Sequence, residues 1–378
     1  MRTLTLLCLL TAFALPGHAA SPQVINSEKA TFTLEQVADG LGIPWGMAFI
    51  SDSQILITER DGTIKLLDTD RNTVTPIQGA PEVYADGQGG LLDVAVPPGY
   101  KAGDWIYFTF VRDNMSEGVT VLARAKLVSD RMEQWQDLLE TDSASGTGRH
   151  FGSRIAFDAT DDESGYIYFG VGDRGIRANG QDLSNHASTV MRLHRDGSVP
   201  KDNPFSQQEN VPAEIWSYGH RNPQGMAYDA GNKRLWLIEH GPRGGDEINL
   251  VLPGRNYGWP VISYGKEYWG PLSVGEGTHK EGMEQPVKQY TPSIAPGSLL
   301  FYTGDAFPAW QGNLFTGALK LTHLNRVTLS DDAKAIGEER LLQDLDERIR
   351  ALAQSPEGWL YFSTDSGKIY VIKPVTTN

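Results

Sequence analysis

The chain has 378 residues, with 33 Lys and Arg against 47 Asp and Glu, and a formal net charge of −14. Such an acidic surface repels nucleic acids and anionic membranes, which argues against both as partners. It suits a small neutral substrate and bound cations better. Cys8 is the only cysteine, so core burial or bound ions, rather than disulfides, must stabilise the fold.

The first twenty residues have the layout of a secretory signal peptide. Arg2 gives a positive start, an apolar run covers Leu4–Leu15, and residues 17–20 form a small-residue exit. The run is too short to span a bilayer, and no later segment is long and apolar enough to do so. We therefore expect cleavage near Ala20 and a periplasmic protein formed by residues 21–378 as one domain. An uncleaved anchor is the alternative.

A strand-like run, a polar turn and a second strand-like run recur about six times along the chain. The first runs lie at Trp45–Phe49, Gly90–Val94, Ser153–Phe157, Gly225–Tyr228, Gly297–Phe301 and Ile349–Ala353. An apolar or aromatic cluster follows each of them, at 55–57, 105–108, 166–169, 235–237, 314–315 and 359–362. Short strands bounded by Gly, Pro, Asp and Asn are typical of an all-β protein.

Six units of four strands would use about 60 residues each, which suits the blades of a propeller. We therefore predict an all-β, six-bladed β-propeller with four-stranded blades and long top-face loops, a pair of β-sandwiches being the alternative. Two Gly- and Pro-rich stretches, Asp182–Pro212 and Pro253–Pro292, are expected as such loops, where function concentrates. The best helical candidate, 331–346, is short and polar.

A histidine precedes the third of these units. His150 has the side chain best suited to take a proton near neutral pH, and Asp173, which follows the next strand-like run, carries a carboxylate that could orient it. Arg221 and Asn222 place a fixed cation beside an amide in a Gly-containing loop. Taken singly, each has an ordinary alternative: a structural histidine, a turn-capping aspartate and a surface arginine.

The segment from Glu239 to Asn249 combines Gly and Pro with two acids, Asp246 and Glu247. Calcium prefers carboxylate and carbonyl oxygens, and Gly and Pro let successive carbonyls point at one ion. The spacing is not that of an EF-hand, and a tight acidic turn is the alternative.

Cationic residues stand near the end of the chain. Arg348 and Arg350 are two residues apart, so on a strand both point the same way, and their planar forks suit carboxylates. Lys320 adds a further cation. The alternative is two solvated surface arginines.

Together these segments resemble the soluble PQQ-dependent aldose sugar dehydrogenases, relatives of the soluble glucose dehydrogenases (PQQ is pyrroloquinoline quinone). The similarity spans nearly all of the chain after residue 20, and the stretch from Trp216 to Pro260 is its most specific part. The matching segments are 86–93 (DGQGGLLD), 150–152 (HFG), 172–173 (GD), 218–225 (YGHRNPQG), 240–249 (HGPRGGDEIN), 256–260 (NYGWP) and 348–350 (RIR). Phe151 and Gly152 after the histidine match the aldose branch rather than the glucose dehydrogenases.

The resemblance implies that aldoses are oxidised at the anomeric carbon to lactones. Hydride passes from C1 to PQQ, His150 acts as general base, Asp173 orients it, and an external acceptor takes the electrons. Arg174, next to Asp173, could compete with the histidine for that carboxylate. The implied cofactor contacts are Gln88, Arg221, Asn222, Tyr268, Lys320, Arg348 and Arg350, with Arg221 also counted as catalytic.

The same resemblance implies two calcium sites. The carbonyls of Gly241 and Pro242 would hold a Lewis-acidic ion against PQQ, with Asp246 as an outer ligand. Glu247 and Tyr257 would hold a structural ion.

Two other functions fit a propeller: a calcium-dependent lactonase, and a non-enzymatic module that binds glycans or proteins. Neither explains why His150, Asp173 and several arginines occur together. We expect no membrane span, and a monomer or a homodimer.

Overall fold

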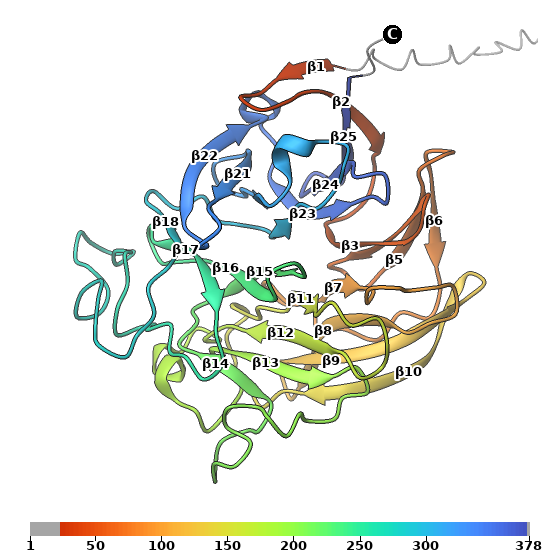
Figure 1. The fold of residues 1–378 in the computed structure, drawn as a ribbon. Helices are drawn as coiled ribbons and strands as arrows, with labels where there is room; N and C mark the ends of the chain where they lie inside the picture. Colours follow the sequence, from red (N-terminus) through yellow and green to blue (C-terminus); the bar gives the residue numbers. More distant parts are fainter. Residues whose placement is uncertain (1–22, 376–378) are drawn as a thin grey trace, which may run out of the picture.

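The computed structural model describes residues 23–375, so the predicted signal peptide lies outside the described residues. Nearly all regular structure in this range is β-strand, with three short 3-10 helices at Arg177–Gln181, Pro308–Trp310 and Gln343–Leu345. No helix within it is long and apolar enough to cross a membrane. Six antiparallel sheets are arranged around a common axis, which confirms the predicted six-bladed β-propeller (Figure 1).

Five sheets consist of four strands that are consecutive in the chain. The first two blades contain β3 (Pro44–Ser51), β4 (Gln54–Glu59), β5 (Ile64–Asp68) and β6 (Thr73–Ile77), then β7 (Leu91–Ala95), β8 (Ile106–Asn114), β9 (Glu117–Val128) and β10 (Arg131–Glu140). The third and fourth contain β11 (Ile155–Phe157), β12 (Tyr166–Val171), β13 (Thr189–His194) and β14 (Ile215–Tyr218), then β15 (Pro223–Asp229), β16 (Arg234–Glu239), β17 (Asp246–Val251) and β18 (Lys288–Tyr290). The fifth contains β19 (Leu300–Phe301), β20 (Leu314–Gly317), β21 (Leu324–Leu329) and β22 (Ala335–Leu341).

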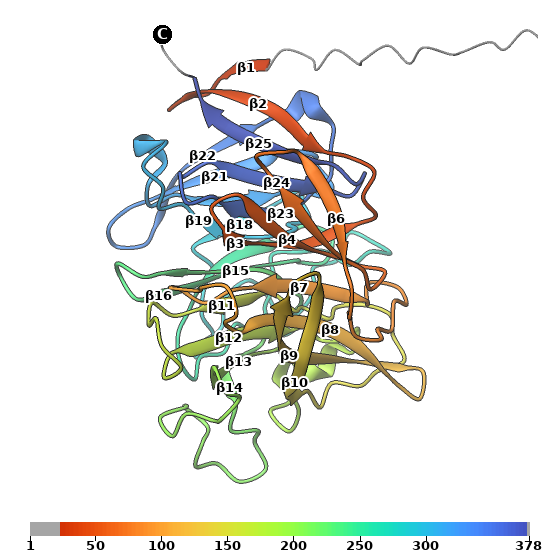
Figure 2. The same cartoon turned by 90° about the vertical axis from the view of Figure 1, so that its right-hand side faces the viewer.

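The sixth blade joins the two ends of the described chain. It contains β23 (Ile349–Gln354), β24 (Leu360–Thr364) and β25 (Ile369–Pro374), and β2 (Thr31–Ala38) adds antiparallel to β25. The short strand β1 (Gln23–Asn26) extends this sheet to five strands (Figure 2). Phe32 and Leu34 of β2 are buried in a hydrophobic cluster with Trp310 of the fifth blade, so β2 closes the ring through its side chains as well as its backbone.

The innermost strands β3, β7, β11, β15, β19 and β23 surround the axis, and each contacts the innermost strands of both neighbouring blades. All six coincide with the first strand-like runs predicted from the sequence. We call the end of the ring at which these strands begin the upper face. The helical candidate at 331–346 proves to be mainly strand β22 followed by a 3-10 turn.

The two long predicted loops take different courses. The stretch 182–212 is interrupted by β13, and because the strands are antiparallel, residues 195–214 connect β13 to β14 at the end opposite the upper face. The stretch 253–292 leaves β17 at that opposite end, pairs with Tyr218 at the end of β14, and brings Trp259 to Asp173. Only the second loop therefore contributes side chains to the site described below.

Ring closure through β2 predicts unequal costs for two substitutions close together in the sequence. Phe32→Ala removes a fully buried ring and should lower the free energy of unfolding by about 3–5 kcal/mol. Val24→Ala, on the 57 % exposed residue of β1, should change it by less than about 0.5 kcal/mol. Denaturant unfolding of both variants tests this, and equal effects would contradict closure through β2.

Candidate active site

Most of the predicted site residues lie just before, or at the start of, an innermost strand. Gln88 precedes β7, His150 precedes β11, and Asn222 precedes β15. Arg348 and Arg350 lie at the start of β23 in the same way. Because all innermost strands begin at the upper face and surround one axis, these side chains gather there although they are up to 262 residues apart in sequence.

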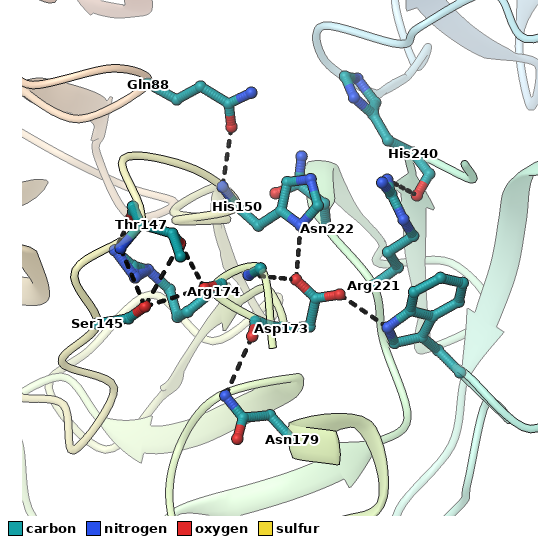
Figure 3. A network of polar contacts seen from close by, with 12 residues as sticks. Gln88, Ser145, Thr147, His150, Asp173, Arg174, Asn179, Arg221, Asn222 and His240 are labelled. Atoms are coloured by element: carbon teal, nitrogen blue, oxygen red, sulfur yellow. Dashed lines mark hydrogen bonds and ion pairs between the residues drawn. The ribbon is translucent and has the colours of Figure 1, made fainter. Parts of the chain in front are cut away.

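His150 and Asp173 form the centre of the polar network in Figure 3. His150 Nδ1 lies 2.5 Å from Asp173 Oδ1. Asp173 Oδ1 also accepts a hydrogen bond from the backbone of Gly175 at 2.7 Å, and Oδ2 accepts one from Trp259 Nε1 at 2.8 Å. With both carboxylate oxygens engaged, Asp173 has one orientation, and it holds the imidazole so that Nε2 is the ring nitrogen left for a substrate.

Local backbone conformation sets the position of His150. His150, Gly152 and Ser153 have φ values of 59°, 64° and 93°, so the chain turns sharply before entering β11. Gln88 Oε1 accepts a hydrogen bond from the His150 backbone N–H at 2.8 Å, which ties this turn to the second blade. Asp173 follows β12, the hydrogen-bonded neighbour of β11, so the ladder of one blade fixes the separation of the pair.

Both members of the pair have shifted pKa values. Burial lowers the pKa of His150, assisted by the positive charge of Arg221, and the hydrogen bond to Asp173 only partly opposes this. Burial acts to raise the pKa of Asp173, but the hydrogen bonds from His150 and from the Gly175 backbone, together with the charge of Arg221, hold that pKa below its usual range. His150 is therefore neutral, and able to accept a proton, at neutral pH.

Arg174 does not compete with His150 for Asp173, contrary to the concern raised by its position in sequence. Its guanidinium stacks 3.8 Å from the centre of the Phe151 ring and donates to the carbonyl of Thr147 at 3.0 Å. Arg174 is fully buried, and burial lowers its pKa to about 10. Its side chain supports the loop behind His150.

Hydrogen bonds and a neighbouring aromatic ring fix the position of Arg221. Its backbone N–H donates to Glu239 Oε2 at 2.5 Å, and its NH1 donates to the carbonyls of His240 and Gly241 at 3.1 and 2.8 Å. The guanidinium carbon lies 5.2 Å from the centre of the Trp259 ring. The positively charged guanidinium of Arg221 therefore binds the carbonyl of Gly241, which is one of the two carbonyls that the resemblance assigned to calcium.

A cavity of about 230 Å³, here called the upper cavity, opens on the axis near His150 and Asp173. Its walls include the predicted cofactor residues Gln88, Asn222, Arg348 and Arg350. Phe151 and Gly152, which directly follow His150, line it as well, whereas His150 itself does not. The walls of the upper cavity also include Trp45, Arg60, Gln224 and His240, which the sequence did not single out.

Asp365, another residue that sequence reasoning missed, bridges the two arginines of the upper cavity. Its carboxylate accepts hydrogen bonds from Arg348 Nε and Arg350 Nε, each at 2.8 Å, and holds both guanidinium groups side by side. Arg348 NH1 also donates to the carbonyl of Leu319 at 2.7 Å.

Three of the predicted cofactor residues, Arg221, Lys320 and Tyr268, do not line the upper cavity. Arg221 lines the small cavity described next. Lys320 is exposed, and Tyr268 is 65 % exposed with its hydroxyl 3.5 Å from Arg221 NH2.

The residues expected to hold two calcium ions surround one small cavity of about 20 Å³, close to the space of a single water molecule. Gly241, Pro242, Glu247 and Tyr257 all line it, together with Glu239. Burial and the nearby charge of Glu239 raise the pKa of Glu247 to about 8. Two carboxylates in so confined a space repel each other unless a proton or a cation lies between them.

Asp246 does not line the small cavity. Its carboxylate accepts hydrogen bonds from Gly241 N at 2.9 Å, from Ser293 Oγ at 2.8 Å and from Ala295 N at 2.9 Å. Asp246 therefore braces the turn that carries Gly241 and Pro242. Within residues 23–375 no group of three or more His, Cys, Asp or Glu side chains is arranged to hold a metal, so an ion here would depend on backbone carbonyls as well.

Comparison with known proteins agrees with this geometry. Residues 41–372 match the family described as Glucose / Sorbosone dehydrogenase. The aldose sugar dehydrogenase YliI of Escherichia coli is 38 % identical over 353 residues, which cover 91 % of this chain and 94 % of that protein.

Two solved structures are similar over almost their whole length. The apo-form of the soluble aldose sugar dehydrogenase from Escherichia coli has a TM-score of 0.86 at 36 % identity, and covers 91 % of this chain and 100 % of that one. The PQQ-bound aldose sugar dehydrogenase from Streptomyces coelicolor has a TM-score of 0.74 at 25 % identity, and covers 93 % and 99 %.

The family match and the similar proteins thus identify this propeller as an oxidoreductase that acts on sugars. The chain belongs to the glucose/sorbosone dehydrogenase family, and its resemblance to the soluble PQQ-type aldose sugar dehydrogenases is confirmed.

The contact between His150 and Asp173 predicts how the histidine titrates. Asp173→Asn removes the charge that opposes burial, so the pKa of His150 should fall further, by roughly 1 or more. NMR titration of the imidazole measures this. Asp113→Asn, on an exposed residue, is the control for the change in net charge and should leave His150 unaffected. An unchanged pKa in Asp173→Asn would show that the contact is not made in solution.

Proposed function

We propose that the protein oxidises aldoses at the anomeric carbon to lactones, with PQQ and calcium bound at the upper face and His150 as the general base. The observation that carries this proposal is the neutral His150, oriented by Asp173 and followed directly by Phe151 and Gly152, which line an axial cavity together with Arg348 and Arg350. We further propose export to the periplasm, from residues 1–20, and an external electron acceptor.

The upper cavity has the chemistry that PQQ requires. PQQ carries three carboxylates, and Arg348 and Arg350 present guanidinium groups that Asp365 has already fixed in orientation. Gln88 and Asn222 add neutral amides on the side nearer His150. The exposed Lys320 and Tyr268 would contribute only at the mouth. A lactonase would have no use for such a set of cations.

The proton is handled by residues of this chain. His150 Nε2 would take the proton of the anomeric hydroxyl, and Asp173 would stabilise the imidazolium that forms, because its carboxylate already binds Nδ1. Trp259 and Gly175 hold Asp173 in place, so little reorganisation is needed. PQQ held in the upper cavity would supply the acceptor for the hydride of C1, and calcium would supply Lewis acidity, so that the sugar would leave as a lactone.

Calcium next to the cofactor would use the carbonyls of Gly241 and Pro242. Since Gly241 O accepts a hydrogen bond from Arg221 NH1, an ion on that carbonyl would take over this contact and free the guanidinium for the cofactor. A structural ion would be held by Glu247 and Tyr257, with the charge of Glu239 nearby. Asp246 supports the turn between the two positions.

The role of His150 is tested by dye reduction with PQQ, calcium and several aldoses. His150→Ala should still bind PQQ but lose turnover by about 10² or more. Turnover of the wild type should rise with pH through a value below about 6.5, because the base is active only when neutral and its pKa is lowered. His194→Ala is the matched control, because His194 lies at the end of β13 that is farthest from the upper face. Unchanged turnover in His150→Ala would refute the assignment, and PQQ binding without sugar-dependent reduction would refute the dehydrogenase.

The structural ion is tested by thermal unfolding with calcium and with a chelator. An ion bound only by the folded state raises Tm, and Glu247→Gln should abolish most of this gain. Glu276→Gln changes the same charge on a residue paired only with Lys280 at the surface, and should respond to calcium like the wild type. A calcium-dependent rise in Tm that survives Glu247→Gln would place the ion elsewhere.

A further inference from the structure

The axial channel of the propeller contains a second cavity. This lower cavity, of about 300 Å³, is lined by residues of five innermost strands and by Ser298 and Leu299, which precede the sixth, β19. Only Asp93 and Arg154 bring charge to it. The residues next to Asp93 and Arg154, among them Leu92 and Gln224, line the upper cavity, so this pair separates the two spaces.

Arg154 is 5 % exposed and contacts the chain segments that begin the five other blades. No other single side chain described above joins more than two blades through its polar atoms. Its contacts are Asp93 Oδ1 at 2.8 Å, the carbonyls of Gln224, Gly297 and Arg350 at 3.0, 2.6 and 3.2 Å, and the Trp45 ring at 3.9 Å.

Burial of this charge is costly. Burial lowers the pKa of Arg154 and raises that of Asp93, so each member of the pair stays charged only because of the other and of the surrounding hydrogen bonds. Replacing such a pair by apolar side chains of similar volume is often neutral or stabilising. Stability alone therefore does not account for an arginine at this position.

Three partners of Arg154 are themselves walls of the upper cavity: Trp45, Gln224 and Arg350. Arg154 bonds the backbone carbonyls of Gln224 and Arg350 and stacks on Trp45, while Asp93 Oδ2 accepts the backbone N–H of Ile155 at 2.9 Å. The guanidinium of Arg154 thus fixes the relative positions of the innermost segments of three blades. It lies directly below the proposed cofactor site.

We propose that Arg154, paired with Asp93, is a positioning residue for the cofactor: it forms the floor of the upper cavity and sets the positions of Arg350, Gln224 and Trp45. This inference rests on the proposed function, since the upper cavity is taken to bind PQQ. Arg154 itself touches neither the substrate nor His150; it acts through the residues that it holds.

The test separates positioning from stability by measuring two quantities on the full-length protein with calcium. PQQ affinity is followed by titration calorimetry without any sugar, and stability by thermal unfolding. The double variant Asp93→Leu/Arg154→Met removes both charges, so its Tm should stay near that of the wild type. Its Kd for PQQ should nevertheless rise about 10- to 100-fold, as is usual when a residue that orients ligand-binding groups is lost.

Arg154→Lys is the second variant. It keeps the charge opposite Asp93, but a single ammonium cannot bond three carbonyls in three blades, so the Kd should rise about tenfold.

Arg326→Met/Glu339→Leu is the matched control. Arg326 is also buried, at 2 % exposed, and pairs with Glu339 at 2.7 Å, but it lies in the fifth blade away from both cavities. This control should bind PQQ like the wild type.

Kd values within twofold of the wild type in Arg154→Lys or in the double variant would overturn the positioning role. An equal loss of affinity in the Arg326 control would also overturn it, because the effect would then follow from any buried pair. If the wild type itself binds no PQQ, the proposed function fails and this inference with it. Wild-type binding combined with unaffected variants removes this inference alone.

Discussion

The ion pair of Arg154 with Asp93 is the interaction on which the centre of this molecule depends. A propeller has its hydrophobic layers between neighbouring blades, as the clusters around Trp310, Phe108 and Phe169 illustrate, and these layers fix each blade only against the next. At the axis the six innermost strands meet without a common core. One guanidinium, with its five donors and a flat face, satisfies carbonyls and a carboxylate from several blades at once. The upper cavity lies directly above this guanidinium, and three residues that it contacts form part of the cavity walls.

The reacting groups then follow from the strand order. His150 and Asp173 adjoin adjacent strands of one blade, so the ladder between β11 and β12 brings them together, and Gln88 and Trp259 from the neighbouring blades then hold them in place. Trp259 and Arg221 come from the fourth blade and its long loop, and Arg348 and Arg350 from the sixth. The proton-transfer pair is thus placed locally, whereas the cofactor site needs the blades to be in register with one another. That division is consistent with the proposed role of Arg154, because packing at the axis would affect the cofactor site more than the distance between His150 and Asp173.

The sequence was sufficient for the repeat and for part of the site. Six recurring pairs of strands predicted the propeller and all six innermost strands, and His150 and Asp173 could be paired because they flank two consecutive strands. Contacts between distant segments could not be predicted: nothing in the chain links Trp259 to Asp173, Asp365 to Arg348, or Arg154 to Gly297. The concern about Arg174 was wrong for a local reason, because the positive φ of this residue, 53°, turns its side chain away to the ring of Phe151. The Glu239–Glu247 pair was missed because the two acids are brought together only by the ladder between β16 and β17.

The pairing of β2 with β25 also governs when the ring becomes complete. Among the described strands β2 is the second in chain order, and its partner β25 is the last. Until β25 is available Phe32 and Leu34 have no blade to pack against, and this non-local pairing belongs to the class of contacts that form slowly. A nascent chain can therefore assemble individual blades but not a closed ring. The closed ring, and with it a complete set of neighbouring blades, therefore forms only when β2 and β25 are both available to pair.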